Sequence, residues 1–402
     1  MVRGGGRSRR RLVLLAILIA ALAGAGLAVI QGPSHPKALP QGGSRFGAAT
    51  TVHAGESLID ALAPLLATDP GRAVGTRALT AEVARRLAQL FVIGIDGTSV
   101  TPATLSRLRA HDWGGVVLGR PNFASQSQLA GLTGGIRAAL PTAPLIVARQ
   151  AGGQSNGFPG MPPRSEPSLG SAGRAGPVTA EARQAARDLR PLGINATLAP
   201  VADLAIPGGP AAGRGFSADP AVVTALVRAA AAGYRAGGLI AMVGHFPGEG
   251  AASQDPAQGA ATVGSGMADL QARDIRPFAG VAPTAPVIQV SDALYAAFDG
   301  VTPATLLPDA VTLLRDRLRF QGVVLSGDLL AVTAATGGSV ADAAVQALKA
   351  GCDLLFLPGG ATDAESAYNA VLAAIRQGQL DPQAISRSLG RVAGLKKGYG
   401  VG

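Results

Sequence analysis

Short apolar runs alternate with longer segments of helical period along most of this chain, and this rhythm is the strongest constraint on its fold. The runs are continuous stretches rich in Val, Ile and Leu, which is typical of strands buried on both faces of a parallel sheet. Eight such runs occur, at Phe91–Ile95, Gly115–Leu118, Pro144–Ala148, Ala196–Val201, Leu239–Val243, Pro286–Val290, Gly322–Leu325 and Asp353–Leu357. Eight strand–helix units in roughly 310 residues predict an α/β protein with a (β/α)8 barrel of the TIM type.

The segments between the runs carry Ala, Leu and Arg with helical spacing. We expect helices at Thr101–Ala110, Gln126–Ala139, Thr179–Leu189, Pro220–Ala236, Pro303–Arg317, Val340–Ala350, Asp363–Gln377 and Asp381–Leu395. A doubly wound open sheet is the alternative fold. No Gly-x-Gly-x-x-Gly motif follows an early strand, which counts against a dinucleotide-binding sheet of that kind.

The composition supports a large folded core and argues against a metal centre. Hydrophobic residues make up 48% of the 402 residues, so the chain can bury a core although Gly and Pro are frequent. The single cysteine, Cys352, excludes an internal disulfide and any metal site built from several cysteines. With only four histidines as well, we expect neither a metal nor another cofactor.

The N-terminal sequence predicts an export signal. Leu12–Ile30 contains nineteen residues without a charge, and five arginines precede it. A helix of that length spans about 28 Å, close to the hydrocarbon core of a bilayer. We therefore expect a transmembrane anchor or signal peptide at residues 1–30, a flexible linker at 31–55, and a barrel domain at 56–402 outside the cytoplasmic membrane.

The net charge of +10 does not indicate a nucleic-acid partner. The five N-terminal arginines account for half of it, and without them 30 basic residues face 25 acidic ones. The remaining basic residues are scattered and are not interleaved with aromatic residues. The expected partner at the N-terminus is therefore the membrane, and the oligomeric state stays open.

Polar residues follow the predicted strands at the ends where barrel enzymes hold their active sites. They are Asp96, Arg120, Asn122, Arg149, Gln150, Asp203, His245, Glu249, Asp292 and Asp328. Glycoside hydrolysis needs two carboxyl groups across a pocket, one to protonate the leaving oxygen and one to attack or stabilise the sugar. For any single Asp of this set, capping the next helix is the alternative role.

Several segments resemble glycoside hydrolase family 3, in particular bacterial β-N-acetylhexosaminidases that act on peptidoglycan fragments. The matching segments occur in the family's order: LAQLFVIG (87–94), GGVVLGRPN (114–122), APVAD (199–203), RGFS (214–217), HFPG (245–248) and FQGVVLSGDL (320–329). The resemblance implies an O-glycosyl hydrolase barrel and a glycan or muropeptide ligand. It also implies substrate-binding roles for Asp203, Arg214 and His245, although Asp203 and Arg214 could instead pair with each other.

The departures from this resemblance fall at the catalytic positions. Gly327 stands where the family has its nucleophile, with Asp328 one residue later, and the family's acid/base Asp-x-His is Asp255 followed by Pro and Ala257. Arg149 replaces an Asp that binds substrate in the family. Successive strand residues point to opposite faces, so Asp328 inherits the nucleophile's direction only if a bulge rotates it.

These departures predict a glycan-binding protein whose standard hydrolytic residues are lost. The first alternative is an active β-N-acetylhexosaminidase with a shifted set of catalytic carboxylates, drawn from Asp328, Glu249 and Asp255. The second alternative is an envelope scaffold that presents the barrel surface to another protein.

Overall fold

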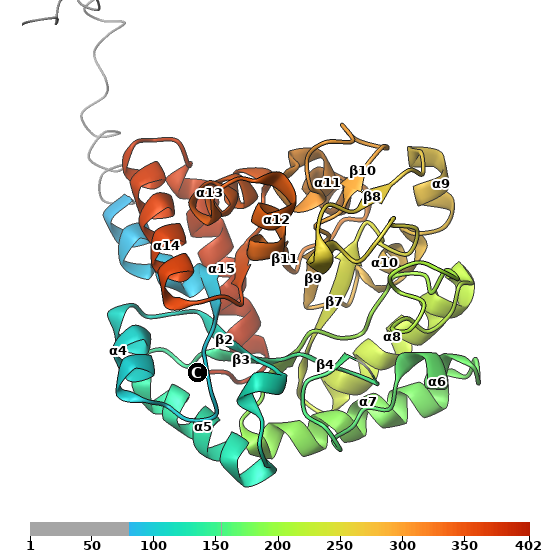
Figure 1. Cartoon of the computed structure of the whole chain (residues 1–402), viewed down its shortest axis with the longest axis horizontal. Helices are drawn as coiled ribbons and strands as arrows, with labels where there is room; N and C mark the ends of the chain where they lie inside the picture. Colours follow the sequence, from blue (N-terminus) through green and yellow to red (C-terminus); the bar gives the residue numbers. More distant parts are fainter. Residues whose placement is uncertain (1–79, 154) are drawn as a thin grey trace, which may run out of the picture. The chain divides into compact units, whose positions relative to one another are not determined.

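Eight parallel strands form a closed barrel in the computed structural model, which describes residues 80–153 and 155–402 (Figure 1). The strands are β1 (Phe91–Gly94), β2 (Gly115–Leu118), β3 (Leu145–Ala148), β6 (Ala196–Thr197), β7 (Ile240–Phe246), β9 (Val287–Val290), β11 (Val323–Asp328) and β12 (Leu354–Leu357). Strand β1 pairs with both β12 and β2, so the sheet has no free edge. The predicted barrel is confirmed and the open sheet is excluded.

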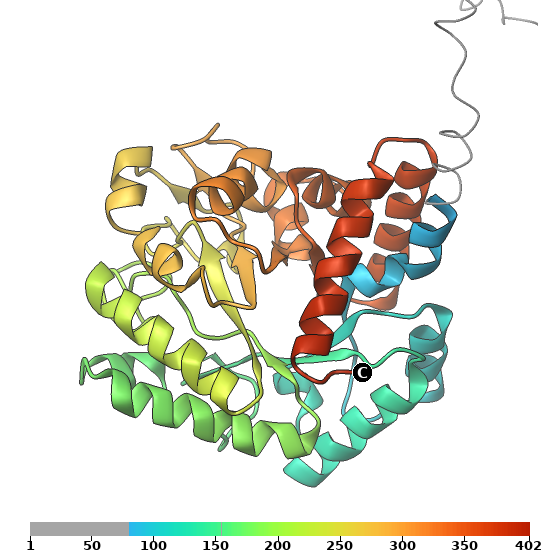
Figure 2. The same ribbon diagram turned by 180° about the vertical axis from the view of Figure 1, so that it is seen from behind.

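Helices surround the strands on all sides, as the two opposite views show (Figures 1 and 2). They are α4 (Pro102–Ala110), α5 (Gln126–Ala139), α6 (Glu166–Gly170), α7 (Ala175–Leu189), α8 (Pro220–Ala236), α9 (Met267–Ala272), α10 (Arg276–Val281), α11 (Pro308–Thr312), α12 (Leu329–Thr336), α13 (Val340–Ala350), α14 (Ala361–Arg376) and α15 (Pro382–Gly398). Local sequence sets several starts. Ser125 and Gln128 form a capping box at α5, and Asp219 caps α8 before Pro220.

The prediction of one continuous helix at Pro303–Arg317 is wrong. The segment consists of a 3₁₀ turn at Ala304–Leu306, then α11, and then a π-helical turn at Leu313–Arg317. The physical reason is Pro308, which holds the preceding Leu307 in an extended conformation (φ −98°, ψ 119°). The new helix can therefore begin only at the proline.

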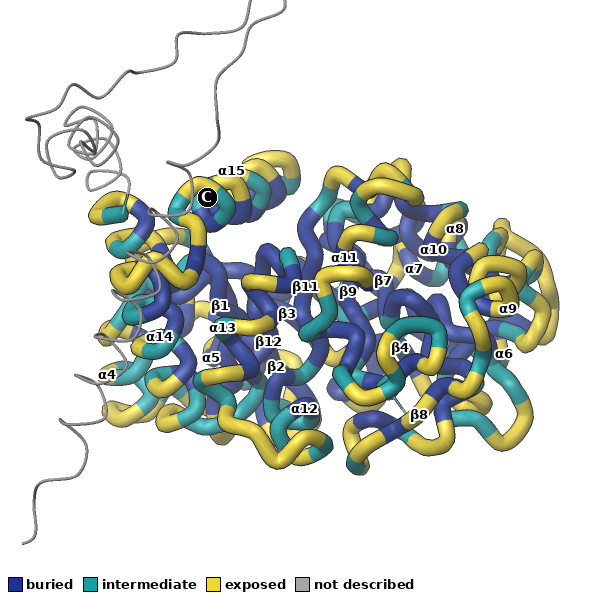
Figure 3. Tube along the Cα trace, turned by 90° about the horizontal axis from the view of Figure 1, so that it is seen from above, coloured by how far each residue is buried: buried dark blue, intermediate teal, exposed yellow. Residues whose placement is uncertain are grey.

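The core lies between the barrel strands and the helices. Every residue of β1, β2, β3, β9 and β12 is buried, which explains their continuous apolar sequences. Figure 3 shows this buried interior enclosed by exposed helix faces.

One buried charge stabilises the end of the barrel opposite the pocket. Asp353, 1% exposed, precedes β12 and accepts hydrogen bonds from Ser388 Oγ at 2.7 Å, Arg391 Nη1 at 2.8 Å and the Val324 N–H at 2.9 Å. It also pairs with Arg315. Four donors therefore compensate the cost of burying this carboxylate.

The N-terminal predictions lie outside the described residues. This holds for the anchor or signal peptide at 1–30, the linker at 31–55 and the first part of the barrel domain up to residue 79. In the part of the chain that the structure does describe, no helix is both long enough and apolar enough to cross a membrane.

Candidate active site

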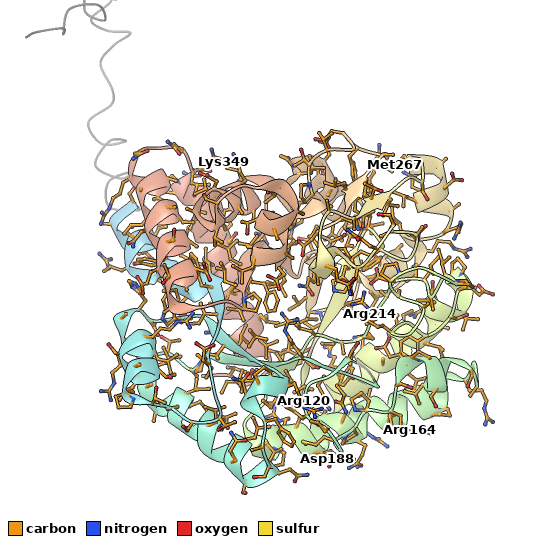
Figure 4. All side chains as sticks on the ribbon, viewed as in Figure 1. Arg120, Arg164, Asp188, Arg214, Met267 and Lys349 are labelled. Atoms are coloured by element: carbon orange, nitrogen blue, oxygen red, sulfur yellow. The ribbon has the colours of Figure 1, made fainter. Side chains whose placement is uncertain are left out.

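A pocket of about 680 Å³ opens at the carboxyl ends of the strands. Its wall is built from loops that follow every strand of the barrel, the arrangement in which barrel enzymes hold their ligands. Five of the six predicted site residues line it: Arg214, His245, Glu249, Asp255 and Asp328. Figure 4 shows Arg120 and Arg214 inside the ring of helices, while Arg164 lies toward its outer edge.

The sixth predicted residue, Asp203, lies behind the pocket wall and contacts His245. Its side chain is fully buried and accepts from His245 Nδ1 at 2.9 Å, from the His245 N–H at 3.2 Å and from the Glu249 N–H at 2.8 Å. The β7–β9 register shifts between Val243 and Phe246, which is where His245 leaves the regular ladder. Asp203 therefore fixes the imidazole and the loop after β7.

His245 lies between two carboxylates, because Glu249 Oε2 is 3.5 Å from the same Nδ1 atom. Burial by itself would lower the pKa of His245, but the charges of Glu249 and Asp203 raise it to about 9. The pKa of Asp203 is lowered, since His245 and the two backbone donors outweigh its burial. Burial raises the pKa of Glu249, and His245 opposes that rise. At neutral pH the imidazole is therefore protonated, and its Nδ1–H donates a hydrogen bond to Asp203.

These three side chains have the spacing of a metal site. One possible ligand atom from each of Asp203, His245 and Glu249 lies within 4.8 Å of the others. The retained proton on His245 competes with a cation, because a metal needs the imidazole in its neutral form. That no metal is used stays a prediction.

Arg214 and Asp255 pair across the pocket wall. Arg214 Nη1 lies 3.4 Å from Asp255 Oδ2, and Arg214 Nε donates to the Pro210 carbonyl at 3.2 Å. The sequence left open an ion pair between Asp203 and Arg214. In the structure Arg214 pairs with Asp255 instead, and Asp203 pairs with His245. Asp255 also accepts from the Ala257 N–H at 3.0 Å and so holds its own loop. Arg214 Nη2 is buried without a partner in the protein.

A register shift between Leu325 and Asp328 brings Asp328 onto the pocket wall. Its Oδ1 caps α12, accepting from the Leu330 N–H at 3.1 Å and the Ala331 N–H at 3.4 Å. Its Oδ2 lies 3.4 Å from Nη2 of Arg149, a residue that directly follows β3. Burial raises the pKa of Asp328, and Arg149 opposes that rise. Both alternatives from the sequence, helix cap and pocket carboxylate, therefore apply to this residue.

Asp292, which follows β9, is a pocket residue that sequence reasoning named but did not select. Its Oδ2 accepts the Asp328 N–H at 2.7 Å, and its Oδ1 is buried without a hydrogen-bond partner. A Cβ atom placed on Gly327 would lie 1.7 Å from that Oδ1 and 2.3 Å from Cγ. The Asp292 carboxyl group thus fills the space that a side chain at position 327 would need. Burial and the nearby Asp328 raise the pKa of Asp292 well above its usual range.

Asn156 is a pocket residue that sequence reasoning missed. It belongs to a short hairpin formed by β4 (Gln150–Gly152) and β5 (Ser155–Asn156), which directly follows β3. Asn156 lines the pocket and donates to the Met161 carbonyl at 3.1 Å, while its Oδ1 is buried without a partner. No motif marked it, because the hairpin's sequence is short and polar.

A closed parallel barrel with several carboxylates around a pocket at the strand ends is an architecture that barrel glycoside hydrolases use. The comparison with protein families agrees, since the glycosyl hydrolase family 3 N-terminal domain matches residues 82–395. The chain belongs to glycosyl hydrolase family 3.

Its relatives include bacterial β-hexosaminidases. That of Stenotrophomonas maltophilia strain K279a is 32% identical over 280 residues, covering 67% of this chain and 83% of the relative. Among solved structures, a family 3 β-N-acetylglucosaminidase from Paenibacillus sp. FPU-7 superposes with a TM-score of 0.76 at 29% identity over 79% of this chain. The chain spans 62% of that enzyme's length. The β-N-acetylhexosaminidase of Beutenbergia cavernae gives a TM-score of 0.72 at 28% identity, over 78% of this chain and 98% of its own. The chain is therefore a family 3 protein of the β-hexosaminidase type.

Proposed function

We propose that the pocket binds the terminal N-acetylhexosamine unit of a β-linked glycan, with peptidoglycan fragments as the natural ligand. The observation that carries this proposal is the pocket lined by several charged side chains at the strand ends of a barrel related to β-hexosaminidases. Two of its wall residues, Asn156 and Arg214, each have a buried side-chain atom without a partner in the protein. A sugar rich in hydroxyl and amide groups can satisfy such atoms.

Calorimetric titration of the full-length chain with N-acetylglucosamine, N,N′-diacetylchitobiose and cellobiose tests this proposal. We expect the N-acetylated sugars to bind and cellobiose to bind at least tenfold more weakly. Arg214→Met removes a charged donor and should weaken binding by about 10- to 150-fold, since hydrogen bonds to charged groups contribute about 1.5–3 kcal/mol. Arg164→Met is the matched control, because Arg164 pairs with Glu181 outside the pocket. Equal affinity for cellobiose would contradict the proposal.

We further propose that hydrolysis does not use the family's two standard positions. Gly327 has no side chain to attack the anomeric carbon C1, and the methyl group of Ala257 cannot protonate a leaving oxygen. Arg149 brings a positive charge to the wall where the sugar would develop its own. Ala257→Gly should therefore leave aryl β-N-acetylglucosaminide turnover within about threefold of the parent, measured by nitrophenol release. A hundredfold loss would contradict this.

A second candidate function is hydrolysis by a shifted carboxylate set drawn from Asp328, Glu249 and Asp255. The register shift in β11 favours it, because it brings the Asp328 carboxylate to the pocket wall. Asp328→Asn keeps the helix cap and removes the charge. Turnover that survives this change would exclude Asp328 as the acting carboxylate.

We also propose that the barrel works outside the cytoplasmic membrane, on the basis of the arginine-flanked apolar segment at Leu12–Ile30. Protease digestion of intact spheroplasts should remove the barrel, whereas a cytoplasmic control protein should survive. Protection of the barrel in intact spheroplasts would overturn this location.

A further inference from the structure

We propose that Asp292 is the catalytic nucleophile of this pocket and forms a covalent bond to C1 of the bound sugar. This inference rests on the proposed N-acetylhexosaminide binding and goes beyond it by assigning a reaction and the residue that performs it. It draws on three observations: the state of the other pocket carboxylates, the position of Asp292 beside Gly327, and the environment of its oxygens.

The other carboxylates of the inner pocket wall are engaged by protein groups. Glu249 contacts His245, and Asp255 pairs with Arg214 and holds the Ala257 N–H. Asp328 uses Oδ1 to cap α12 and places Oδ2 against Arg149. The remaining lining carboxylate besides Asp292, Asp96, is exposed at the rim.

Asp292 has a different environment. It lines the pocket, is partly buried, and has one carboxyl oxygen with no hydrogen-bond partner. Among the described residues no Lys or Arg side chain forms an ion pair with it. A buried carboxyl oxygen without a hydrogen-bond partner, here Oδ1, is costly for folding and is a mark of functional sites.

The position of Asp292 is determined by its two neighbours on β11. The Asp328 N–H tethers Oδ2 at 2.7 Å, and Gly327 leaves the space in which the carboxyl group lies. Strands β9 and β11 are paired in the barrel, so their ends lie side by side. The carboxyl group is therefore held in one place at the pocket wall, which is what attack on a positioned carbon requires.

The reaction balances with an aryl glycoside and water. One oxygen of ionised Asp292 bonds to C1 while the bond between C1 and the aryl oxygen breaks, and its electron pair leaves with the aryloxide. Water then adds to C1 and the ester bond to Asp292 breaks. The electrons return to the carboxylate, and the water's second proton passes to solvent.

Covalent trapping on the full-length chain tests the assignment. The probe is 5-fluoro-N-acetyl-β-glucosaminyl fluoride, whose reactive leaving group allows formation of the ester while the ring fluorine slows its hydrolysis. We expect the intact mass to rise by one glycosyl unit, and peptide mapping to place it on Asp292. Asp292→Ala should abolish labelling and lower 4-nitrophenyl N-acetyl-β-glucosaminide turnover at least about a thousandfold. The control Asp316→Asn, on an exposed turn, should label normally.

A second variant moves the carboxyl group instead of removing it, so the test does not depend only on a loss of activity. Gly327→Asp combined with Asp292→Ala moves the carboxyl group to the neighbouring strand, and we expect turnover at least tenfold above Asp292→Ala alone, with the label at position 327. N-acetylglucosamine binding and thermal unfolding of each variant report whether it is folded. A parent protein that binds N-acetylglucosamine but is neither labelled nor active would overturn the assignment and leave the binding proposal standing. A label on any other residue, or unchanged turnover in Asp292→Ala, would also overturn it. Absence of binding would overturn the proposed function itself.

Discussion

Gly327→Ala should destabilise the protein through a steric conflict with Asp292. The new Cβ would lie 1.7 Å from Asp292 Oδ1, so the carboxyl group must move by roughly 1.5 Å or more to reach ordinary contact distance. That movement breaks the 2.7 Å hydrogen bond from the Asp328 N–H. Overpacking costs about 1–3 kcal/mol and an unsatisfied buried donor about 1–3 kcal/mol. The free energy of unfolding should therefore fall by about 2–6 kcal/mol.

A double-mutant cycle isolates this conflict. In Asp292→Ala the carboxyl group is absent, so adding Gly327→Ala should cost at least about 2 kcal/mol less than it does in the parent. Urea unfolding can be followed by the fluorescence of Trp113, the single tryptophan, which is buried. The control is Gly131→Ala in α5, where a Cβ meets no atom within 4 Å and should stabilise by about 0.5–1 kcal/mol. Additive effects in the cycle, or a Gly327→Ala protein as stable as the parent, would refute the reasoning.

The charges of His245, Asp353 and Asp292 each lead to a further testable expectation. Because the pKa of His245 is raised from 6.5 to about 9, its stabilisation is complete below pH 6.5 and lost as the pH rises through 9. Urea unfolding at pH 6 and pH 10 should differ by up to about 3 kcal/mol more in the parent than in His245→Gln. Asp353→Ala should cost about 3–5 kcal/mol in the same assay, whereas Glu82→Ala, which removes an exposed pair, should cost under about 1 kcal/mol. Turnover of the aryl glycoside should rise with pH as Asp292, whose pKa is raised, loses its proton, and a flat profile would contradict its role as nucleophile.

The barrel could be predicted because its strands are buried on both faces and therefore carry an unbroken apolar signal. Each of the eight predicted runs overlaps one barrel strand. The helix ends were predictable where a cap or proline marks them, as at Pro220–Ala236. The helix expected at Pro303–Arg317 shows the limit. Its residues have helical spacing, but Pro308 interrupts the helix because it holds Leu307 in an extended conformation.

The location of the site could also be predicted, since residues that follow parallel strands meet at one end of a barrel. The contacts within the site could not. Asp203 was placed in the pocket by its position after a strand, yet the tight turn at His245 and Glu249 draws it behind the wall. Arg214 lies in a long loop, and its partner Asp255 comes from another loop. Pairing between loops depends on their three-dimensional paths, which the spacing of residues does not specify.

Gly327 shows why a missing side chain can be misread from sequence. Taken alone, a glycine at a catalytic position indicates lost chemistry. In the fold the same glycine is the condition for another carboxyl group to occupy that space, because any Cβ there would collide with Asp292. Which neighbour fills the space depends on how the ends of β9 and β11 lie against each other, and the register shift before Asp328 determines the position of the N–H that tethers Asp292. The missing side chain at Gly327 on β11 and the Asp292 carboxylate after β9 are therefore one structural feature. Activity should depend on these two residues together rather than on position 327 alone.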